Sequence, residues 1–416
     1  MRILVITNLY PPHEIGGYEI RCRDVCERLK SFGHEIHVLT SDHQVPGRET
    51  TPDPAVSRKL LIHGMYGHPW LPIHRLHALE QQNQLALQQE IAAVQPDLIH
   101  VWNMGGISKS LLLRLEQSSI PIVYDVSDHW IARSLRADVW LSWWNAPGSF
   151  ARTMTRKILT NIGIRRHLDS ATPTASWDQL RFKNTYFCSA FMRELTAAQG
   201  WPVSHASVIH CGIDTAAFSV KQDHSHFDKL LWVGRLAPDK DPLTAIRALA
   251  AAHRAGLNHL TLDLYGHGDP SYISQIDTEI DTLGLTKMVR RKLAPAAEMR
   301  RLYAEYDALL FTSNWGEPFA LTPLEAMASG LPVITSLDGG QAELARHGVN
   351  CLVAAAAEPV TYADRIAELA ASPELRASIA ATSLAEVRTR FDLNPITRQI
   401  ETFLLETSLH HSTLPR

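Results

Sequence analysis

Several sequence features that mark common protein classes are scarce in this chain of 416 residues. Its five cysteines are an odd number at unrelated spacings, so they indicate neither a disulfide framework nor metal-binding pairs. No run of about 18 apolar residues occurs, and we therefore expect no transmembrane helix. The formal charge is only -3 and no long basic run is present, which argues against wrapping nucleic acid as the main function.

Signals for a bound metal and for export are missing as well. The 21 histidines are scattered, and none belongs to a His-Glu-x-x-His or comparable ligand cluster. The N-terminus passes straight into a predicted strand, without the charged leader and apolar core of a signal peptide. We therefore expect a cytoplasmic protein with free buried thiols, no metal and no cofactor.

The chain does contain two stretches that open in the same way. At 416 residues it is too long for one ordinary core, and its length predicts two domains. Residues 2–7 and 35–40 have the pattern of buried strands that flank an amphipathic helix over 18–32, which makes a βαβ unit. A second unit of this kind begins with the predicted strand at 229–233.

Glycines and cations follow the first strand of each unit. Gly16 and Gly17 precede the first helix, where missing side chains allow an anion to approach the backbone closely. The full dinucleotide fingerprint is absent, so by itself this pair fits a simple turn equally well. In the second unit Gly234 is followed by Arg235 and Lys240, two cations that either clamp a diphosphate or form a solvated pair.

Two glutamates near the C-terminus are the most informative feature. The strand predicted at 308–312 places Glu317 beyond its carboxyl end, where ligands of open α/β sheets bind. Thr322 fits the N-cap of a short helix that Gly330 closes, and Glu325 would complete a capping box with Thr322. The box explains Glu325 without a ligand. For Glu317 the sequence leaves a ligand role and a structural role equally open.

These motifs resemble those of a known enzyme family. The spacing Glu317-x7-Glu325, followed by Ala-Met-Ala-x-Gly-x-Pro-Val, is similar to the signature of the fourth family of retaining glycosyltransferases. The resemblance implies an α/β protein with the GT-B fold, two Rossmann-like domains facing each other across a central cleft. It places an N-terminal acceptor domain at 1–207, a C-terminal nucleotide-sugar donor domain at 208–390, and a helix that crosses back, with a tail, at 391–416.

The resemblance also implies roles for the matching residues. In the family the first glutamate holds the hydroxyls of the donor sugar and the second holds the ribose of the nucleotide. The pattern Gly-Arg-Leu-x3-Lys assigns Arg235 and Lys240 to the donor pyrophosphate. The residues expected at the catalytic centre are Glu317, Arg235, Lys240, His129 and Asp128. Those expected to bind the donor are Gly16, Gly17, Gly234, Gly266, Phe319, Ala320, Leu321, Thr322 and Glu325.

The chain departs from the family pattern at several positions. The strand at 121–126 ends in Ser127-Asp128-His129, where the family commonly has His-Asp. Ser127 therefore stands at the histidine's position, and His129 either lines the cleft or is structural. Ala320 replaces a common glycine. The stretch 288–293, which lines the base pocket in the family, lacks the usual glycine and is unusually basic, so the donor base is not indicated.

The Asp-x-Asp motif of metal-dependent glycosyltransferases is formally present at 239–241. We interpret Asp241 as the N-cap of a helix that begins with Pro242, and no metal is expected.

We predict an enzyme, a retaining and metal-independent glycosyltransferase that uses a nucleotide sugar, linked to UDP or GDP. Arg235, Lys240 and the helix N-terminus before Thr322 would stabilise negative charge on the leaving diphosphate without a cation. The acceptor, a glycan, a lipid-linked sugar or a small molecule, is not indicated. Two alternatives stay open: a sugar-nucleotide epimerase with the same fold, and a catalytically inactive nucleotide-sugar-binding protein, which Ser127 and Ala320 suggest.

Residues 140–166 combine tryptophans and Phe150 with spaced arginines and lysine. Aromatic side chains beside cations favour either peripheral contact with the inner face of a membrane or a basic solvated helix that packs its aromatics inward. The second interpretation is slightly favoured, and neither involves nucleic acid.

Overall fold

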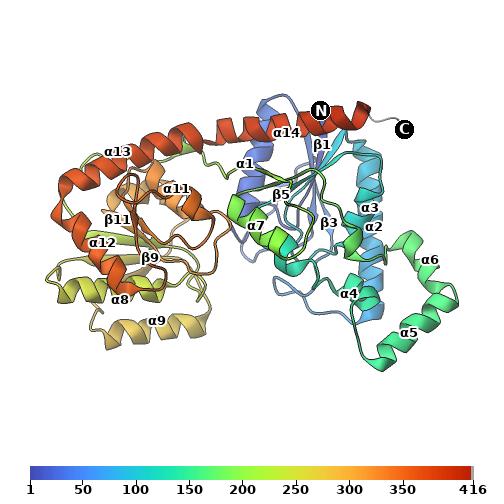
Figure 1. Ribbon diagram of the computed structural model, residues 1–416, viewed down its shortest axis with the longest axis horizontal. Helices are drawn as coiled ribbons and strands as arrows, with labels where there is room; N and C mark the ends of the chain where they lie inside the picture. The colour runs from blue at the N-terminus through green and yellow to red at the C-terminus, as the bar shows by residue number, and fades with distance from the viewer. Residues whose placement is uncertain (414–416) are drawn as a thin grey trace. The chain divides into compact units, whose positions relative to one another are not determined.

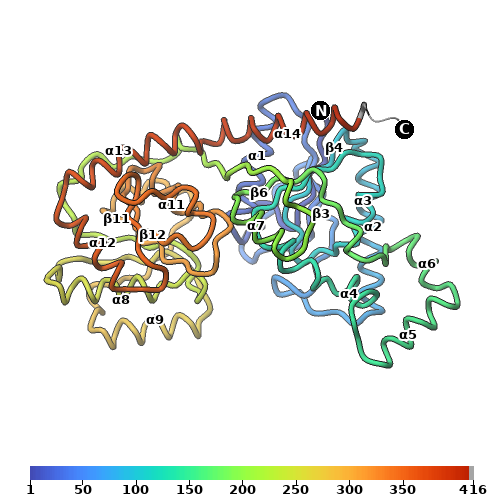
Figure 2. Tube along the Cα trace, in the orientation of Figure 1, coloured from blue at the N-terminus to red at the C-terminus, as the bar shows by residue number. Residues whose placement is uncertain are grey.

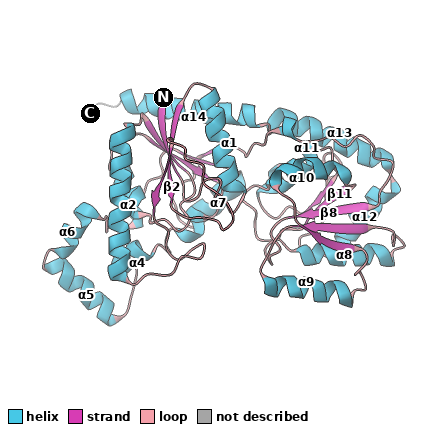
Figure 3. Cartoon of the chain, turned by 180° about the vertical axis from the view of Figure 1, so that it is seen from behind, coloured by secondary structure: helices cyan, strands magenta, loops and turns pink. Residues whose placement is uncertain are grey.

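The structure of the protein is a computed structural model that describes residues 1–413 (Figures 1 and 2). The chain forms two compact units. Unit 1 comprises Met1–Ile209 and the chain from Thr397 onward, and unit 2 comprises His210–Ile396. In each unit the strands lie between helices (Figure 3), which is the layered arrangement that buries both faces of a sheet.

Unit 1 is built on a seven-stranded parallel sheet with strand order β3-β2-β1-β4-β5-β6-β7. Because both faces are covered, a central strand such as β1 is almost continuously apolar. The strands are β1 (Arg2–Ile6), β2 (Glu35–Ser41), β3 (Val56–Leu60), β4 (Leu98–Val101), β5 (Ile122–Val126), β6 (Thr185–Phe187) and β7 (Ser207–Val208). The helices are α1 (Gly17–Ser31), α2 (Ile73–Val94), α3 (Ser110–Glu116), α4 (Val139–Asn145), α5 (Phe150–Asn161), α6 (Ile164–Ala171) and α7 (Ala190–Ala198), with a π-helical turn η1 (Trp130–Ser134).

Unit 2 is built on a six-stranded parallel sheet with strand order β10-β9-β8-β11-β12-β13. Its strands are β8 (Lys229–Val233), β9 (Thr261–Tyr265), β10 (Val289–Lys292), β11 (Ala308–Phe311), β12 (Val333–Thr335) and β13 (Leu352–Val353). Its helices are α8 (Pro242–Arg254), α9 (Pro270–Thr282), α10 (Ala296–Leu302), α11 (Leu321–Ala328), α12 (Pro359–Ala371) and α13 (Pro373–Arg390).

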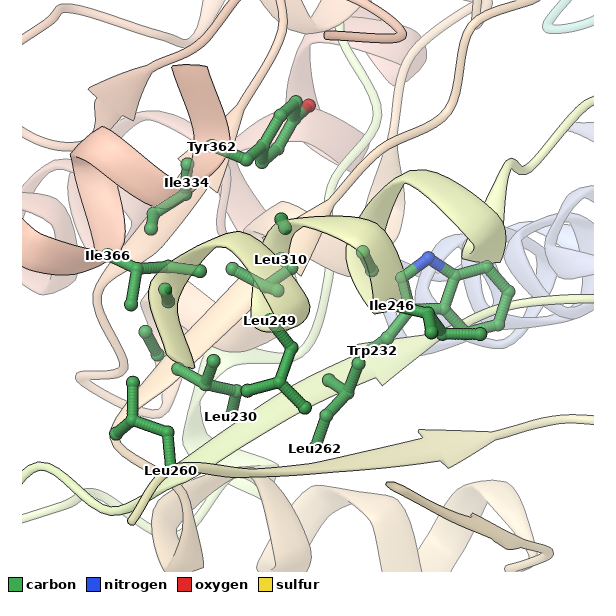
Figure 4. Packing of buried hydrophobic residues seen from close by; sticks show 14 of the residues in the cluster. Leu230, Trp232, Ile246, Leu249, Leu260, Leu262, Leu310, Ile334, Tyr362 and Ile366 are labelled. Atoms are coloured by element: carbon green, nitrogen blue, oxygen red, sulfur yellow. The ribbon is translucent and has the colours of Figure 1, made fainter. Parts of the chain in front are cut away.

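The core of unit 2 fixes β8 and β11 in the middle of its sheet. Leu230 on β8, Leu262 on β9 and Leu310 on β11 pack against Leu249 of α8 and Ile366 of α12 (Figure 4). All five side chains are almost completely buried. The loops that leave the carboxyl ends of β8 and β11 therefore start from rigid positions.

The last helix, α14 (Leu393–Thr413), runs from unit 2 into unit 1. Its part in unit 1 is held by specific contacts. Glu401 lies 2.9 Å from the imidazole of His34, and the guanidinium of Arg398 lies 3.5 Å from the ring centre of Phe32.

The elements predicted at the start of each unit are confirmed within one or two residues. The helix predicted at 18–32 is α1, which ends where Gly33 adopts a φ of 94°, and the strand predicted at 229–233 is β8. Local patterns suffice here because buried parallel strands are continuous apolar runs and glycine ends helices.

The strand order also shows where each sheet has its topological switch point, the place at which the order of successive strands reverses. In unit 2, β8 lies between β9 and β11, so the connections that leave β8 and β11 run to opposite sides of the sheet. A crevice forms at the carboxyl ends of the strands at such a switch point, and ligands of open α/β sheets bind there. Arg235 and Lys240 follow β8, and Glu317 follows β11. In unit 1 the equivalent position lies between β1 and β4.

The aromatic residues within 140–166 fall into two groups. Trp140 and Trp144 are buried, and the indole nitrogen of Trp140 donates a hydrogen bond of 2.9 Å to the carbonyl of Pro173. Phe150, on α5, is 82 % exposed. The interpretation that aromatics pack inward thus holds for these two tryptophans and is wrong for Phe150.

Candidate active site

The centre of the candidate site is an ion pair across the switch point of unit 2. The Lys240 Nζ atom lies 2.5 Å from Oε1 of Glu317, and the hydroxyl of Ser313 donates a second hydrogen bond of 2.6 Å to the same oxygen. Glu317 is 7 % exposed. The sequence predicted both residues at the site, and the fold brings them into direct contact, although they lie 77 positions apart.

An aromatic ring completes this arrangement. The Lys240 ammonium lies 4.8 Å from the centre of the Trp315 ring. A cation over an indole face is favourable, because the face carries partial negative charge. Lys240 is thus held between a carboxylate and a ring, and its side chain stays about one fifth exposed.

The backbone of Glu317 is fixed by the loop that follows β12. Glu317 pairs with Gly339 in an isolated parallel bridge, and its carbonyl accepts a 2.7 Å hydrogen bond from the amide of Gly340. Gly339 has a φ of 124°, and a Cβ atom there would lie 2.5 Å from the amide nitrogen of Glu317. Only glycine allows this approach, which explains why position 339 is a glycine.

The two glycines at the ends of β8 and β9 allow a second close approach. A Cβ atom on Gly266 would lie 1.8 Å from the carbonyl oxygen of Gly234. Next to this contact, the amide of Leu236 donates a 2.8 Å hydrogen bond to the carbonyl of His267. The missing side chain at Gly266 therefore lets the two loops come close enough for this backbone hydrogen bond.

Arg235 makes a different contact. Its guanidinium lies 2.9 Å from a carboxylate oxygen of Asp239, and the Arg235 side chain is 52 % exposed. Arg235 is therefore near Lys240 along the chain but is paired separately, at the surface.

The interpretation of Asp241 as a helix cap is confirmed. Its side chain accepts a 3.1 Å hydrogen bond from the amide of Thr244, and α8 begins at Pro242. The Asn314 amide also donates to it, at 3.0 Å. The other carboxylate of the Asp-x-Asp motif, Asp239, is paired with Arg235. Within residues 1–413 no cluster of three or more His, Cys, Asp or Glu side chains could hold a metal ion.

The predicted start of the helix after Glu317 is wrong. Helix α11 begins at Leu321, Ala320 is its N-cap, and no side chain caps it. Thr322 therefore lies inside the first turn of the helix, two positions after the N-cap. Gly330 does end the helix, with a φ of 64°.

The capping box predicted for Glu325 is consequently absent. A carboxylate oxygen of Glu325 instead accepts a 2.7 Å hydrogen bond from the hydroxyl of Tyr303. Burial raises the pKa of Glu325, and the hydrogen bond from Tyr303 lowers it in part. The capping box, which could have explained Glu325 without a ligand, therefore does not form.

The loop between Glu317 and α11 packs against an aromatic cluster. Phe319 and Ala320 are buried, and the ring centre of Phe319 lies 5.1 Å from that of His210 and 5.8 Å from that of Phe391. His210 in turn lies 2.9 Å from the carboxylate of Glu343. The sequence did not single out His210 as a site residue, because its partners Phe319 and Glu343 lie far along the chain.

In unit 1, the predicted residues Gly16 and Gly17 are exposed at the start of α1. Gly16 is the N-cap, and its amide donates a 2.8 Å hydrogen bond to the carboxylate of Glu19. Burial raises the pKa of Glu19. Glu19 was not predicted, although glutamate three positions after a helix cap is a known sequence signal.

Asp128 and His129 follow β5. Asp128 Oδ1 accepts a 2.7 Å hydrogen bond from the amide of Trp130, which forms the turn into η1, and burial raises the pKa of Asp128 to about 7. His129 is 6 % exposed. Burial therefore favours the protonated form of Asp128, and the His129 side chain is almost enclosed.

Comparisons with known proteins show which family the chain belongs to. The sequence profile described as "Glycosyltransferase Family 4" matches residues 15–217, and the profile described as "Glycosyl transferases group 1" matches residues 217–383. An uncharacterized glycosyltransferase of Methanocaldococcus jannaschii is 24% identical over 371 residues, which cover 84% of each chain. The chain belongs to glycosyltransferase family 4.

Solved structures show the same fold. The Anabaena protein Alr3699/HepE in complex with UDP-glucose superposes with a TM-score of 0.66 at 21% identity, covering 98% of this chain and 100% of that one. Sucrose-phosphate synthase from Thermosynechococcus elongatus superposes with a TM-score of 0.70 at 18% identity, covering 99% and 100%. This family 4 glycosyltransferase therefore has the GT-B fold with two Rossmann-like domains.

Ser127, at the position where the family commonly has histidine, belongs to a buried network in unit 1. Arg21 forms an ion pair with Asp125, at 2.8 Å, and donates a hydrogen bond of the same length to the hydroxyl of Ser127. Ser127 donates to Asp125 at 2.7 Å. The serine thus completes the hydrogen bonding of a buried ion pair, which sequence analysis did not find because the partners lie on α1 and β5.

The basic stretch of this family 4 member at 288–293 is largely neutralised. Arg290 and Lys292 both contact the carboxylate of Asp263, at 2.8 and 2.6 Å, and the hydroxyl of Tyr306 donates to it at 2.6 Å. Burial alone would raise the pKa of Asp263, but these three hydrogen bonds lower it. The stretch therefore offers less free positive charge than its sequence indicates.

No helix within residues 1–413 has both the length and the apolar character that crossing a bilayer requires.

Proposed function

We propose that this family 4 glycosyltransferase is a retaining, metal-independent enzyme that transfers a sugar from a nucleotide-diphosphate sugar. The observation that carries the proposal is the contact between Lys240 and Glu317 at the switch point of unit 2. The carboxylate accepts hydrogen bonds from sugar hydroxyls, and the ammonium donates to phosphate oxygens. The pair thus offers both chemistries that a sugar diphosphate requires.

The leaving group would be stabilised by fixed positive charge. When the bond between the anomeric carbon and the diphosphate oxygen breaks, the electron pair stays on the diphosphate. Lys240 and Arg235 then face growing negative charge. The N-terminus of α11 adds to this effect, because no side chain caps it and its amides and helix dipole favour an anion. Charge stabilisation of this kind does not require a metal ion.

UDP is the donor nucleotide that we propose first. The support comes from the similar Anabaena protein, whose structure contains UDP-glucose. Glu325, held by Tyr303, is proposed to bind the ribose, and Gly16 and Gly17 remain predicted donor residues.

The acceptor is proposed to enter a pocket of about 270 Å³ in unit 1. Its apolar wall includes Trp70 and Trp140, and its polar side includes Lys109 and Asp138. The imidazole of His63 also lines it, with a buried Nε2 atom that has no hydrogen-bond partner among residues 1–413. Aromatic walls with a few polar groups suit a sugar ring. Trp70 lines the pocket and is 69 % exposed. Trp70→Ala removes part of the apolar wall, so it is expected to raise the acceptor KM and leave the donor Kd unchanged.

The test of the catalytic assignment uses Glu317→Gln and Lys240→Met. Each is expected to lower kcat/KM for donor turnover about 10²-fold or more, which is the usual effect of removing one charge-stabilising group. The matched control is the surface pair Arg247→Met and Glu279→Gln, also on unit 2, which should leave turnover unchanged. Wild-type turnover by the Glu317 or Lys240 variant would end the assignment. NMR of the anomeric proton in the product tests retention, and turnover in EDTA tests independence from metal.

Two other functions remain to be separated from this one. A sugar-nucleotide epimerase with the same fold would change the donor with no acceptor present, which NMR of the donor alone detects. An inactive binding protein, which Ser127 and Ala320 suggested, would bind UDP-sugar in calorimetry without turnover on any acceptor. Peripheral membrane contact through 140–166 also remains a proposal. The sequence suggested it from tryptophans beside cations, whereas in the structure Trp140 and Trp144 are buried and Phe150 is exposed.

A further inference from the structure

Helix α5 of unit 1 has no buried residue. Phe150, Met154, Ile158 and Ile162 follow one another at intervals of four, which places them along one side of the helix and its C-cap. Their exposed fractions are 82, 41, 53 and 63 %, respectively. These four residues are called the α5 stripe below. Single exposed apolar side chains are common, but a continuous row on one helix indicates a surface that binds something.

The side of α5 opposite the stripe attaches the helix to the rest of unit 1. Arg156 donates hydrogen bonds to the carbonyls of Trp144 and Ala146, at 3.0 and 2.8 Å, and Arg152 donates to that of Trp143 at 3.2 Å. These arginines hold α5 against the end of α4. In Figure 1, α5 and α6 project as a hairpin from the rest of unit 1. The stripe therefore faces away from the bonds that attach the hairpin.

The hairpin is strongly cationic although the whole chain has a formal charge of -3. Between Asp138 and Asp169 the sequence contains no carboxylate side chain. The cations in this interval are Arg152, Arg156, Lys157, Arg165 and Arg166. Lys157 and Arg166 are exposed, and within residues 1–413 neither has an ion-pair partner. By helical spacing, Lys157 lies beside the stripe, three positions after Met154 and seven after Phe150.

We propose that the α5–α6 hairpin docks on an anionic phospholipid surface through the α5 stripe. A helix with an apolar side, a cationic flank and low overall hydrophobicity is the form that lies in the bilayer interface. Anionic headgroups attract the unpaired cations, and the apolar side chains enter the acyl boundary. A second copy of this chain is a poorer partner, because a symmetric dimer through the stripe would bring the same cations of two copies together. The proposal is independent of the donor chemistry in unit 2.

Flotation of the full chain with vesicles tests the proposal. The wild type should float with vesicles of phosphatidylcholine containing about one third phosphatidylglycerol, less so as salt is raised, and not with phosphatidylcholine alone. Phe150→Ser with Ile158→Ser should weaken binding at least about tenfold, since two large apolar groups leave the bilayer. Lys157→Gln with Arg166→Gln should weaken it about 25-fold, roughly fivefold for each cation removed.

Matched controls change exposed residues elsewhere. Val360→Ser with Leu409→Ser removes two apolar groups that are 62 and 66 % exposed, and Arg254→Gln with Lys287→Gln removes two exposed cations. Both should bind vesicles like the wild type. All these residues are exposed, so the variants should fold, and donor turnover in solution should not change.

Three outcomes would overturn the proposal. One is a wild type that does not float with anionic vesicles, and another is a stripe variant that floats as well as the wild type. The third is a wild-type dimer in light scattering that the stripe variant dissociates, which would assign the stripe to a second copy. Failure of donor turnover, in contrast, would affect only the function proposed for unit 2.

Discussion

The contact between Lys240 and Glu317 predicts a measurable coupling between the two side chains. Lys240→Met leaves the Glu317 carboxylate, 7 % exposed, with the Ser313 hydroxyl as its remaining side-chain donor. Loss of a hydrogen bond to a charged group costs about 1.5–3 kcal/mol. Because the Lys240 side chain is about one fifth exposed, we expect a loss of about 2 kcal/mol in the free energy of unfolding.

The reverse change should cost less. Glu317→Gln keeps an acceptor for Ser313 and leaves a cation that can turn toward the Trp315 ring and solvent, so we expect a loss of about 1 kcal/mol. The double variant contains no unpaired charge and should also lose only about 1 kcal/mol. The coupling energy between Lys240 and Glu317 is therefore expected to be about 2 kcal/mol.

Urea unfolding at pH 7, followed by near-ultraviolet circular dichroism, measures the three variants against the wild type. For a unit of about 150–250 residues, each kcal/mol also corresponds to roughly 2–4 °C in Tm. The control cycle uses Arg247→Met and Glu279→Gln, a pair of 2.7 Å at the surface, whose coupling should stay below about 1 kcal/mol.

Activity separates the two roles of the pair. The double variant should regain stability but not turnover, because it restores charge balance and still lacks both groups that bind the donor. Additive losses of stability at Lys240 and Glu317, within about 0.5 kcal/mol, would refute the reasoning that the contact is a coupled ion pair. Recovery of turnover in the double variant would refute the catalytic assignment instead.

Three further predictions concern other parts of the molecule. Gly266→Ala places a Cβ 1.8 Å from a backbone carbonyl and should lower Tm far more than Gly284→Ala, where φ is also positive but no atom lies within 4 Å; equal shifts in a thermal melt would contradict this. Tyr303→Phe removes the hydrogen bond that lowers the pKa of Glu325, so the donor KM should rise more at pH 5 than at pH 8, and a uniform change across pH would argue against it. The folded-state pKa of Asp128, about 7, lies above its unfolded value, so its ionisation destabilises the fold as pH rises from about 4 to 7. The free energy of unfolding of Asp128→Asn, measured in urea relative to that of the wild type, should therefore be higher at pH 8 than at pH 5. An equal difference at both pH values would show that the pKa of the carboxyl is not raised.

The error at α11 has a functional consequence. The sequence Thr322-x-x-Glu325 fits a capping box, and local rules favour it. In the structure the helix begins at Leu321 without a side-chain cap, and Glu325 turns to Tyr303, 22 positions earlier in the chain. The helix start is thereby left open to an anion, as the proposed binding of a diphosphate requires. Local pattern rules cannot anticipate a partner that distant folding supplies.

Much of the fold could be predicted from short-range patterns. The βαβ unit at the start of the chain and β8 follow from continuous apolar runs and from helix-ending glycine, because these signals depend on neighbours within a few residues. The Asp241 cap followed in the same way from Asp241-Pro242. The exposure of Phe150 was one of two interpretations that the sequence left open, since aromatics beside cations do not show whether another element covers them.

The sequence by itself determined the fold class and the family, because the motif around Glu317 and the apolar strand pattern are local and specific. It also determined which residue types stand at the carboxyl ends of β8 and β11. Only the tertiary structure decided that Lys240 contacts Glu317 while Arg235 pairs with Asp239. The physical reason is that strand order and the backbone approach at Gly339 bring Glu317 to Lys240 from 77 positions away, whereas Asp239 lies only four residues from Arg235.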